Sequence, residues 1–169
     1  MKKIFVLLVA VAAFGFAANA QTDNAIGIRF GSSGLGGSAY YNAEASFQHA
    51  LGTANRLELD AGLALANESY YYIVGVYHWT FNIVNGLNWY IGPGLQLGYC
   101  TAKTNGETHG LGLAVAGQVG IEYKFDFPLM VSLDVRPTYT LPFLMSEYCG
   151  RRANGGIDFG SCFSVRYCF

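Results

Sequence analysis

The sequence contains few charged residues and, beyond its N-terminus, no long uninterrupted apolar stretch. Charged residues make up 12% of its 169 residues, against roughly 25% in typical soluble domains. Hydrophobic residues nevertheless make up 52%. No stretch after residue 20 is apolar for the roughly 20 residues that a membrane-spanning helix needs. The apolar residues must therefore be spread by alternation with polar ones.

Residues that carry chemistry are also scarce. The three histidines, His49, His78 and His109, are far apart, and none stands in a His-x-Ser pattern. From these scattered positions we expect no metal site, no cofactor and no catalytic site. Four cysteines without a CxxC pair give no support to redox catalysis. Of the 10 basic residues 8 remain without Lys2 and Lys3, against 11 acidic ones. That balance does not indicate nucleic-acid binding.

The N-terminus has the three parts of a secretory signal peptide. Lys2 and Lys3 are followed by an apolar segment at 4–18 and by the small-x-small pattern at 18–20. We expect residues 1–20 to be cleaved and residues 21–169 to form one domain. A membrane anchor helix is the less favoured alternative, because the apolar segment is only ~15 residues long.

Alternation of apolar and polar residues predicts eight strands. They are expected at 25–32, 38–50, 55–66, 70–81, 87–101, 111–125, 129–141 and 156–169. Short turns are expected at 52–54, 82–86 and 126–128, and longer loops at 33–37, 101–110 and 142–155, with 67–69 as a short exception. Pro93 and Pro137 fall inside strands, where we expect a local bulge because proline removes a ladder hydrogen bond. The pattern predicts an all-β fold, an eight-stranded antiparallel up-and-down transmembrane barrel.

Charged side chains of the predicted strands share one face. They are Arg29, Glu44, Arg56, Glu58, Asp60, Glu122, Lys124, Asp134, Arg136, Asp158 and Arg166. The opposite face has no charge and has aromatic residues near both strand ends, as membrane barrels have at the two interfaces. Alternation alone also permits a soluble barrel with an apolar lining.

The last strand ends on the terminal residue of the chain. Phe163, Val165, Tyr167 and Phe169 form its apolar face. With the signal peptide and the eight strands, this ending resembles the small outer-membrane β-barrels of the OmpA/OmpX type that consist of the barrel alone. The resemblance implies the outer membrane of a Gram-negative bacterium, with both termini in the periplasm. It also implies contact with outer-membrane lipid and lipopolysaccharide, and recognition of the C-terminal strand by the barrel-assembly machinery.

The lumen of such a barrel is just wide enough to be filled by side chains. Charges inside it must be paired, which predicts a salt-bridge plug and a structural or interaction role without catalysis. A narrow pore for ions or very small solutes is the alternative. Inward glycines would leave space for it beside Tyr90 and Gln96; they are Gly62, Gly92, Gly94, Gly98, Gly112 and Gly120. Lipid A modification, which some small outer-membrane barrels catalyse, is less favoured.

The outside loops hold the remaining candidates. Cys100 and Cys149 are both expected at the outer face, where they could form a disulfide. Phe143, Tyr148, Arg151 and Arg152 lie in the last loop. Arginine suits phosphate groups, so this loop could contact a protein partner or lipopolysaccharide. The alternative is a loop that folds over the mouth of the barrel.

Overall fold

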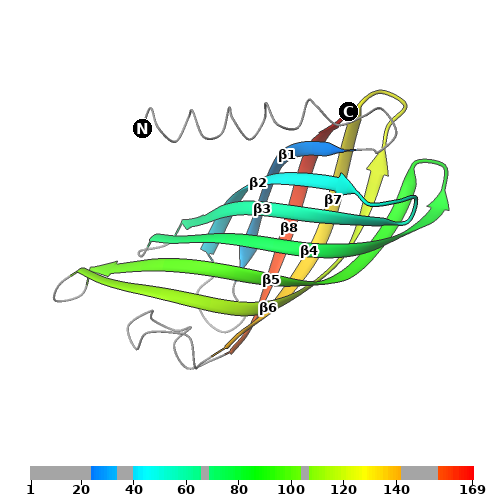
Figure 1. The fold of residues 1–169 in the computed structure, drawn as a ribbon. Coiled ribbons are helices and arrows are strands. Elements are labelled where there is room, and N and C mark those ends of the chain that lie inside the picture. The colour runs from blue at the N-terminus through cyan, green and yellow to red at the C-terminus, as the bar shows by residue number, and fades with distance from the viewer. Residues whose placement is uncertain (1–23, 34–39, 66–68, 104–106, 142–155) are drawn as a thin grey trace.

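The chain forms a closed antiparallel barrel of eight strands, in a computed structural model that describes residues 24–33, 40–65, 69–103, 107–141 and 156–169 (Figure 1). Neighbours in the sequence are neighbours in the sheet. The strands are β1 (Ala25–Ser33), β2 (Tyr40–Ala50), β3 (Asn55–Leu65), β4 (Ser69–Val84), β5 (Leu87–Lys103), β6 (Glu107–Lys124), β7 (Leu129–Thr140) and β8 (Gly156–Cys168). The predicted strand number and the all-β barrel are confirmed.

The barrel closes between its first and last strands, β1 and β8, which lie side by side in Figure 1. Ala25 stands opposite Cys168 in this pairing. Just beyond it, the N–H of Asn24 donates to the carbonyl of Phe169 at 3.1 Å, and the N–H of Phe169 donates back at 2.9 Å. Closure leaves the sheet without an exposed edge, so the strands need no further partner for their backbone groups.

The hairpin between β4 and β5 is tighter than the turn predicted at 82–86. A two-residue turn at Asn85 and Gly86 connects the strands, and Gly86 has a φ of 79°. An Asn-Gly pair is a strong sequence signal for a two-residue hairpin turn, because such turns need positive φ, which glycine adopts readily. A bulge between Asn82 and Val84 then shifts the register by one residue. It pairs Val84 with Leu87, and both Ile83 and Val84 are exposed there.

The loop predicted at 101–110 is also too long. Strand β5 continues to Lys103 and β6 begins at Glu107, so only residues 104–106 separate them. The alternation rule underestimated these strands because polar residues follow one another near their ends. Continued pairing with the neighbouring strand, which includes Cys100 opposite Gly110, extends the ladder there.

The bulges predicted at the two prolines are absent from the described strands. Pro93 pairs with Gly117 of β6, and Pro137 pairs with Phe159 of β8, each in an unbroken register. On the other side of each proline a short stretch of the ladder is missing, yet the register is the same before and after it. The missing N–H of a proline removes one ladder hydrogen bond. The ladder hydrogen bonds before and after the gap keep the register unchanged.

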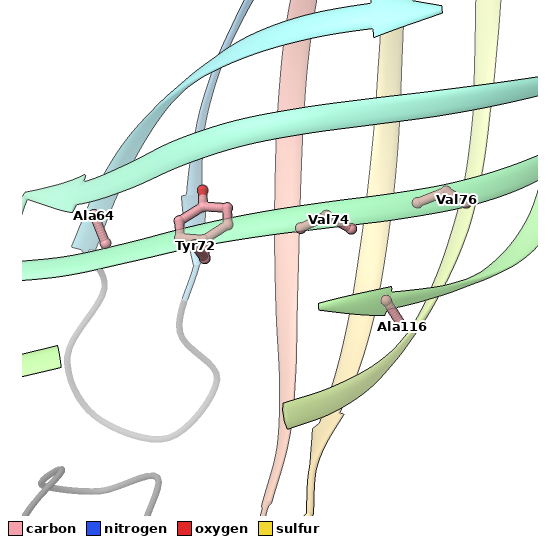
Figure 2. Close-up of a cluster of buried hydrophobic side chains, with 5 residues drawn as sticks. All are labelled: Ala64, Tyr72, Val74, Val76 and Ala116. Carbon is pink, nitrogen blue, oxygen red and sulfur yellow. The ribbon is translucent and has the colours of Figure 1, made fainter. Parts of the chain in front are cut away.

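The interior of the barrel is mainly polar, and some of its buried apolar residues form a small cluster. Figure 2 shows this cluster, in which Tyr72, Val74 and Val76 follow one another along β4, with Ala64 of β3 and Ala116 of β6. Large apolar residues are mostly on the outer surface instead. No helix in the described part of the chain is long and apolar enough to cross a membrane.

Candidate functional site

Arg29 of β1 lies at the centre of the lumen and contacts four carboxylates. Its Nη2 is 2.8 Å from Oδ1 of Asp134, its Nε is 3.0 Å from Oε2 of Glu44, and its Nη1 is 3.4 Å from Oδ2 of Asp60. The same Nη1 also forms an ion pair with Glu58. All five side chains are essentially inaccessible to solvent, so protein groups rather than water compensate this guanidinium.

Glu58 of β3 is shared by further donors from around the barrel wall. Nη2 of Arg166 lies 3.0 Å from its Oε2, and Nη2 of Arg136 lies 3.5 Å from its Oε1. Gln118 donates to Oε1 at 3.1 Å, and Gln48 donates to Oε2. One carboxylate therefore connects strands that are not neighbours in the sheet.

The remaining donors of Arg136 are used as well. Its Nη1 is 3.1 Å from Oε2 of Glu44, its Nη2 pairs with Asp60, and its Nε donates to Gln118 at 3.1 Å. Three of the four carboxylates that contact Arg29, namely Glu44, Glu58 and Asp60, are thus held a second time by another strand. This sharing is the geometry that a buried charge needs, because a carboxylate with one weak partner would be strongly destabilising away from water.

Arg166 of β8 is held by three hydroxyl groups in addition to Glu58. Its Nε donates to Ser46 at 3.1 Å, and its Nη1 donates to Ser132 at 2.9 Å and Ser164 at 2.7 Å. The serines lie on β2, β7 and β8. Neutral polar residues of the inward face therefore complete the network, and short serine side chains leave the space that the guanidinium fills.

A second cluster surrounds Arg56 of β3. Its Nη1 is 2.6 Å from Oε2 of Glu122, its Nε donates to Nδ1 of His78 at 3.3 Å, and its Cζ lies 4.6 Å from the centre of the Tyr90 ring. Tyr90 joins this cluster to the central one, because its hydroxyl donates to Oδ2 of Asp134 at 3.1 Å. Polar contacts therefore continue along much of the lumen.

The structure places all eleven charged residues predicted for the lumen on the inward face. Nine are buried, while Lys124 and Asp158 are half-buried near opposite ends. Sequence reasoning did not assign His78, Tyr72 or Tyr90 to the network. Their inward positions follow from the same alternation, but their partners lie on other strands, so alternation could not identify the contacts.

At three of the inward glycines, Gly62, Gly98 and Gly120, the predicted space is filled by tyrosine rings. A Cβ at Gly62 would lie 2.5 Å from the ring of Tyr72, and a Cβ at Gly98 would lie 2.0 Å from the hydroxyl of Tyr70. Tyr90 fills the position beside Gly120 in the same way, with ring carbon and hydroxyl 2.6 Å from such a Cβ. At these three glycines the prediction of space was wrong, because large side chains from neighbouring strands pack over them.

The outer surface carries two sets of aromatic residues separated by aliphatic ones. Tyr41, Tyr71, Tyr99 and Tyr139 are exposed near the ends where residues 34–39, 66–68, 104–106 and 142–155 connect the strands. Near the other end are Trp79, Phe81, Trp89, Tyr123, Tyr167 and Phe169, and the rings of Phe81 and Trp89 stack at 4.5 Å. So extensive an exposed apolar surface is unusual in a soluble monomer and has the pattern of a membrane barrel.

The apolar face of the C-terminal strand lies on this outer surface. Phe163, Tyr167 and Phe169 are exposed, and Val165 is half-exposed. The other predicted features cannot be placed in the same way. Cys149 and the candidate contact residues Phe143, Tyr148, Arg151 and Arg152 lie outside the described residues, as does the segment 1–20, so those assignments stay predictions.

No protein-family model matches the sequence, and no curated protein matches it either. Solved structures do resemble the fold. Neisserial surface protein A matches with a TM-score of 0.68 at 13% identity, over 89% of this chain and 98% of that one. The N-terminal β-barrel domain of Pseudomonas aeruginosa OprF matches with a TM-score of 0.66 at 16% identity, over 88% and 100%.

The outer-membrane enzyme PagL also matches, with a TM-score of 0.54 at 12% identity, over 83% of this chain and 97% of that one. At such low identity the likeness concerns the fold alone, and this fold accommodates both enzymes and proteins of other kinds. The chain therefore has the fold of the small eight-stranded outer-membrane β-barrels.

Proposed function

We propose that the protein is an integral barrel of the outer membrane of a Gram-negative bacterium, with a plugged lumen and a structural or loop-mediated role. The observation that carries this proposal is the sharing of Glu58 among Arg29, Arg136 and Arg166, with no exposed surface on the carboxylate. An ion crossing the lumen would have to separate these groups. Breaking a buried ion pair is strongly unfavourable.

A narrow pore is the second candidate, and conductance distinguishes the two. We expect the refolded mature protein to leave a planar bilayer silent, and Arg136→Ala to produce small reproducible steps because it removes a cross-lumen link. Asp126→Ala, in an exposed turn, is the matched control and stays silent. A gel shift between boiled and unboiled samples verifies folding for each variant. Steps from the unaltered protein would contradict the plug and favour the pore.

The contacts of His78 and His49 give no support to a catalytic role for these two residues. His78 is buried in the lumen and accepts from Arg56. Nδ1 of His49 lies 2.7 Å from Oδ1 of Asn24, at the end of the barrel where Asn24 and Phe169 pair. Catalysis by the mechanism of acyl hydrolases needs a histidine within reach of a nucleophile. Mass spectra of lipid A from cells with and without the protein test this, and a changed lipid A pattern would contradict a non-enzymatic role.

The orientation and the outer contacts are part of the same proposal. Asn24 and Phe169 meet at the end whose connections, 51–54, 85–86 and 125–128, are all short, whereas the two longest connections, 34–39 and 141–155, are at the opposite end. Outer-membrane barrels have short turns on the periplasmic side. A protease site inserted at 142–155 should be cut on intact cells, and one inserted at 125–128 should not. Arg151→Ala with Arg152→Ala should weaken binding to lipopolysaccharide if that loop contacts its phosphates; unchanged binding would remove the loop from the proposal.

A further inference from the structure

The buried charges of the described residues do not balance. Four arginines face five carboxylates: Arg29, Arg56, Arg136 and Arg166 against Glu44, Glu58, Asp60, Glu122 and Asp134. His78 adds no charge, because its Nδ1 accepts a hydrogen bond and so holds no proton. The half-buried Lys124 and Asp158 have opposite signs. One negative charge is therefore in excess, in surroundings where an uncompensated charge is costly.

A small cavity lies next to this network, at the end of the lumen away from the chain termini. Its volume is about 30 Å³, which has room for a small ion together with a water molecule. Oxygen-bearing side chains dominate its lining, among them Asn42, Glu44, Tyr72, Gln96 and Asp158. Arg136 also borders it, but that guanidinium is already paired with Glu44 and Asp60.

Asn42 provides an independent sign of a missing ligand. Its Nδ2 donates to Oε1 of Glu44 at 3.2 Å and to the hydroxyl oxygen of Tyr72 at 3.0 Å, which determines how the amide is oriented. Its Oδ1 is buried and accepts no hydrogen bond. Water cannot easily compensate for this, because the residue is only 6% exposed. Buried carbonyl oxygens normally have a partner, so this atom calls for a donor or a cation.

We propose that this cavity binds one small monovalent cation, of the size of sodium, potassium or ammonium. Carboxylate, amide and phenol oxygens are the donors that hard cations prefer. A single positive charge would offset the single excess negative charge. A divalent ion is less suited, because its two positive charges would exceed the single excess negative charge.

The inference goes beyond the proposed plug, and stability tests it independently of conductance. The urea unfolding constant of the refolded barrel is measured in micelles in sodium, potassium, ammonium and N-methyl-D-glucamine chloride at equal ionic strength. Equal ionic strength keeps general screening constant. At a cation concentration ten times its dissociation constant, site binding lowers the unfolding constant about tenfold relative to the bulky N-methyl-D-glucamine ion.

Two substitutions in the cavity lining and one control substitution then locate the effect. Asp158→Asn keeps the shape of a half-buried residue of the cavity lining but removes its charge, and should abolish most of the cation dependence. Asp126→Asn removes the same charge from an exposed turn, and should leave the dependence intact. Asn42→Leu, which removes the unpartnered oxygen, should act like Asp158→Asn.

The unaltered protein alone can overturn the proposal, so a variant that fails to fold does not remove the test. Equal unfolding constants in all four salts would contradict it. A stability that changes with pH but not with the cation would show that a proton balances the network instead. A cation effect of equal size in Asp158→Asn and Asp126→Asn would place binding elsewhere and refute this site.

Discussion

Nη2 of Arg166 lies 3.0 Å from Oε2 of Glu58, and this ion pair joins β8 to β3 across the lumen. Neither side chain has exposed surface. The two residues are 108 positions apart in the chain, so their contact forms only when the barrel closes. It gives closure an electrostatic contribution in addition to the backbone ladder between β1 and β8.

Replacing Glu58 should strongly destabilise the barrel. Glu58→Ala removes the one carboxylate that Arg29, Arg136 and Arg166 all contact, and Arg166 loses its ion pair. Removing one partner of a buried ion pair costs about 3–5 kcal/mol. Urea unfolding followed by gel shift measures this cost. Asp126→Ala in an exposed turn is the control, with a change near zero. Equal stability of the two variants would mean that the lumen charges are solvated rather than paired.

The two kinds of inward glycine should differ in their tolerance of alanine. A Cβ at Gly92 would lie 1.6 Å from the backbone oxygen of Tyr77, whereas at Gly62 it would meet the movable ring of Tyr72. We expect Gly62→Ala to cost about 1–3 kcal/mol, as overpacking does, and Gly92→Ala to cost more.

Tyr72→Ala supplies the matched test of that explanation. In this background Gly62→Ala should lose most of its cost, because the ring that the new methyl group meets is absent, while Gly92→Ala should keep its cost. A double-mutant cycle measures the coupling between Gly62 and Tyr72. Zero coupling would show that the ring does not pack over this glycine.

A charge on the outer surface should be harmful in proportion to its depth. Leu95 is 59% exposed and lies between the aromatic sets at the two ends of β5. Leu95→Arg should cost about 2–4 kcal/mol of folding free energy in lipid vesicles, as arginine near the bilayer midplane does. Leu51→Arg, in a turn, should cost roughly 0–1 kcal/mol. Similar costs at both positions would contradict the assigned membrane position.

We propose that the exposed C-terminal face acts in assembly rather than in stability. Phe169→Ala removes a ring of that face but retains the backbone bonds to Asn24. It should lower the amount of barrel in the outer membrane of cells, while the purified variant refolds in micelles with nearly unchanged yield. Phe159→Ala, another exposed ring of β8, is the control. Equal cellular levels of the two variants would argue against terminal recognition.

Much of the fold could be predicted from local patterns. The alternation around Leu57 and Glu58 in β3, or Leu133 and Asp134 in β7, identifies strands and their two faces, because successive side chains of any strand point to opposite sides. The Asn85-Gly86 pair also carried the signal for its tight turn. The bulge beside it was not readable, since it depends on which residues of β4 and β5 pair.

The sequence by itself therefore determined that eight strands form, that their charges share one face and that the other face is apolar and aromatic-rich, since each follows from neighbours within a strand. Only the tertiary structure decided that Arg166 meets Glu58, that Tyr72 covers Gly62, and that Asn42 retains an unpartnered oxygen beside a cavity. Those contacts cross the lumen or join neighbouring strands, so they depend on register and closure, which no single strand encodes.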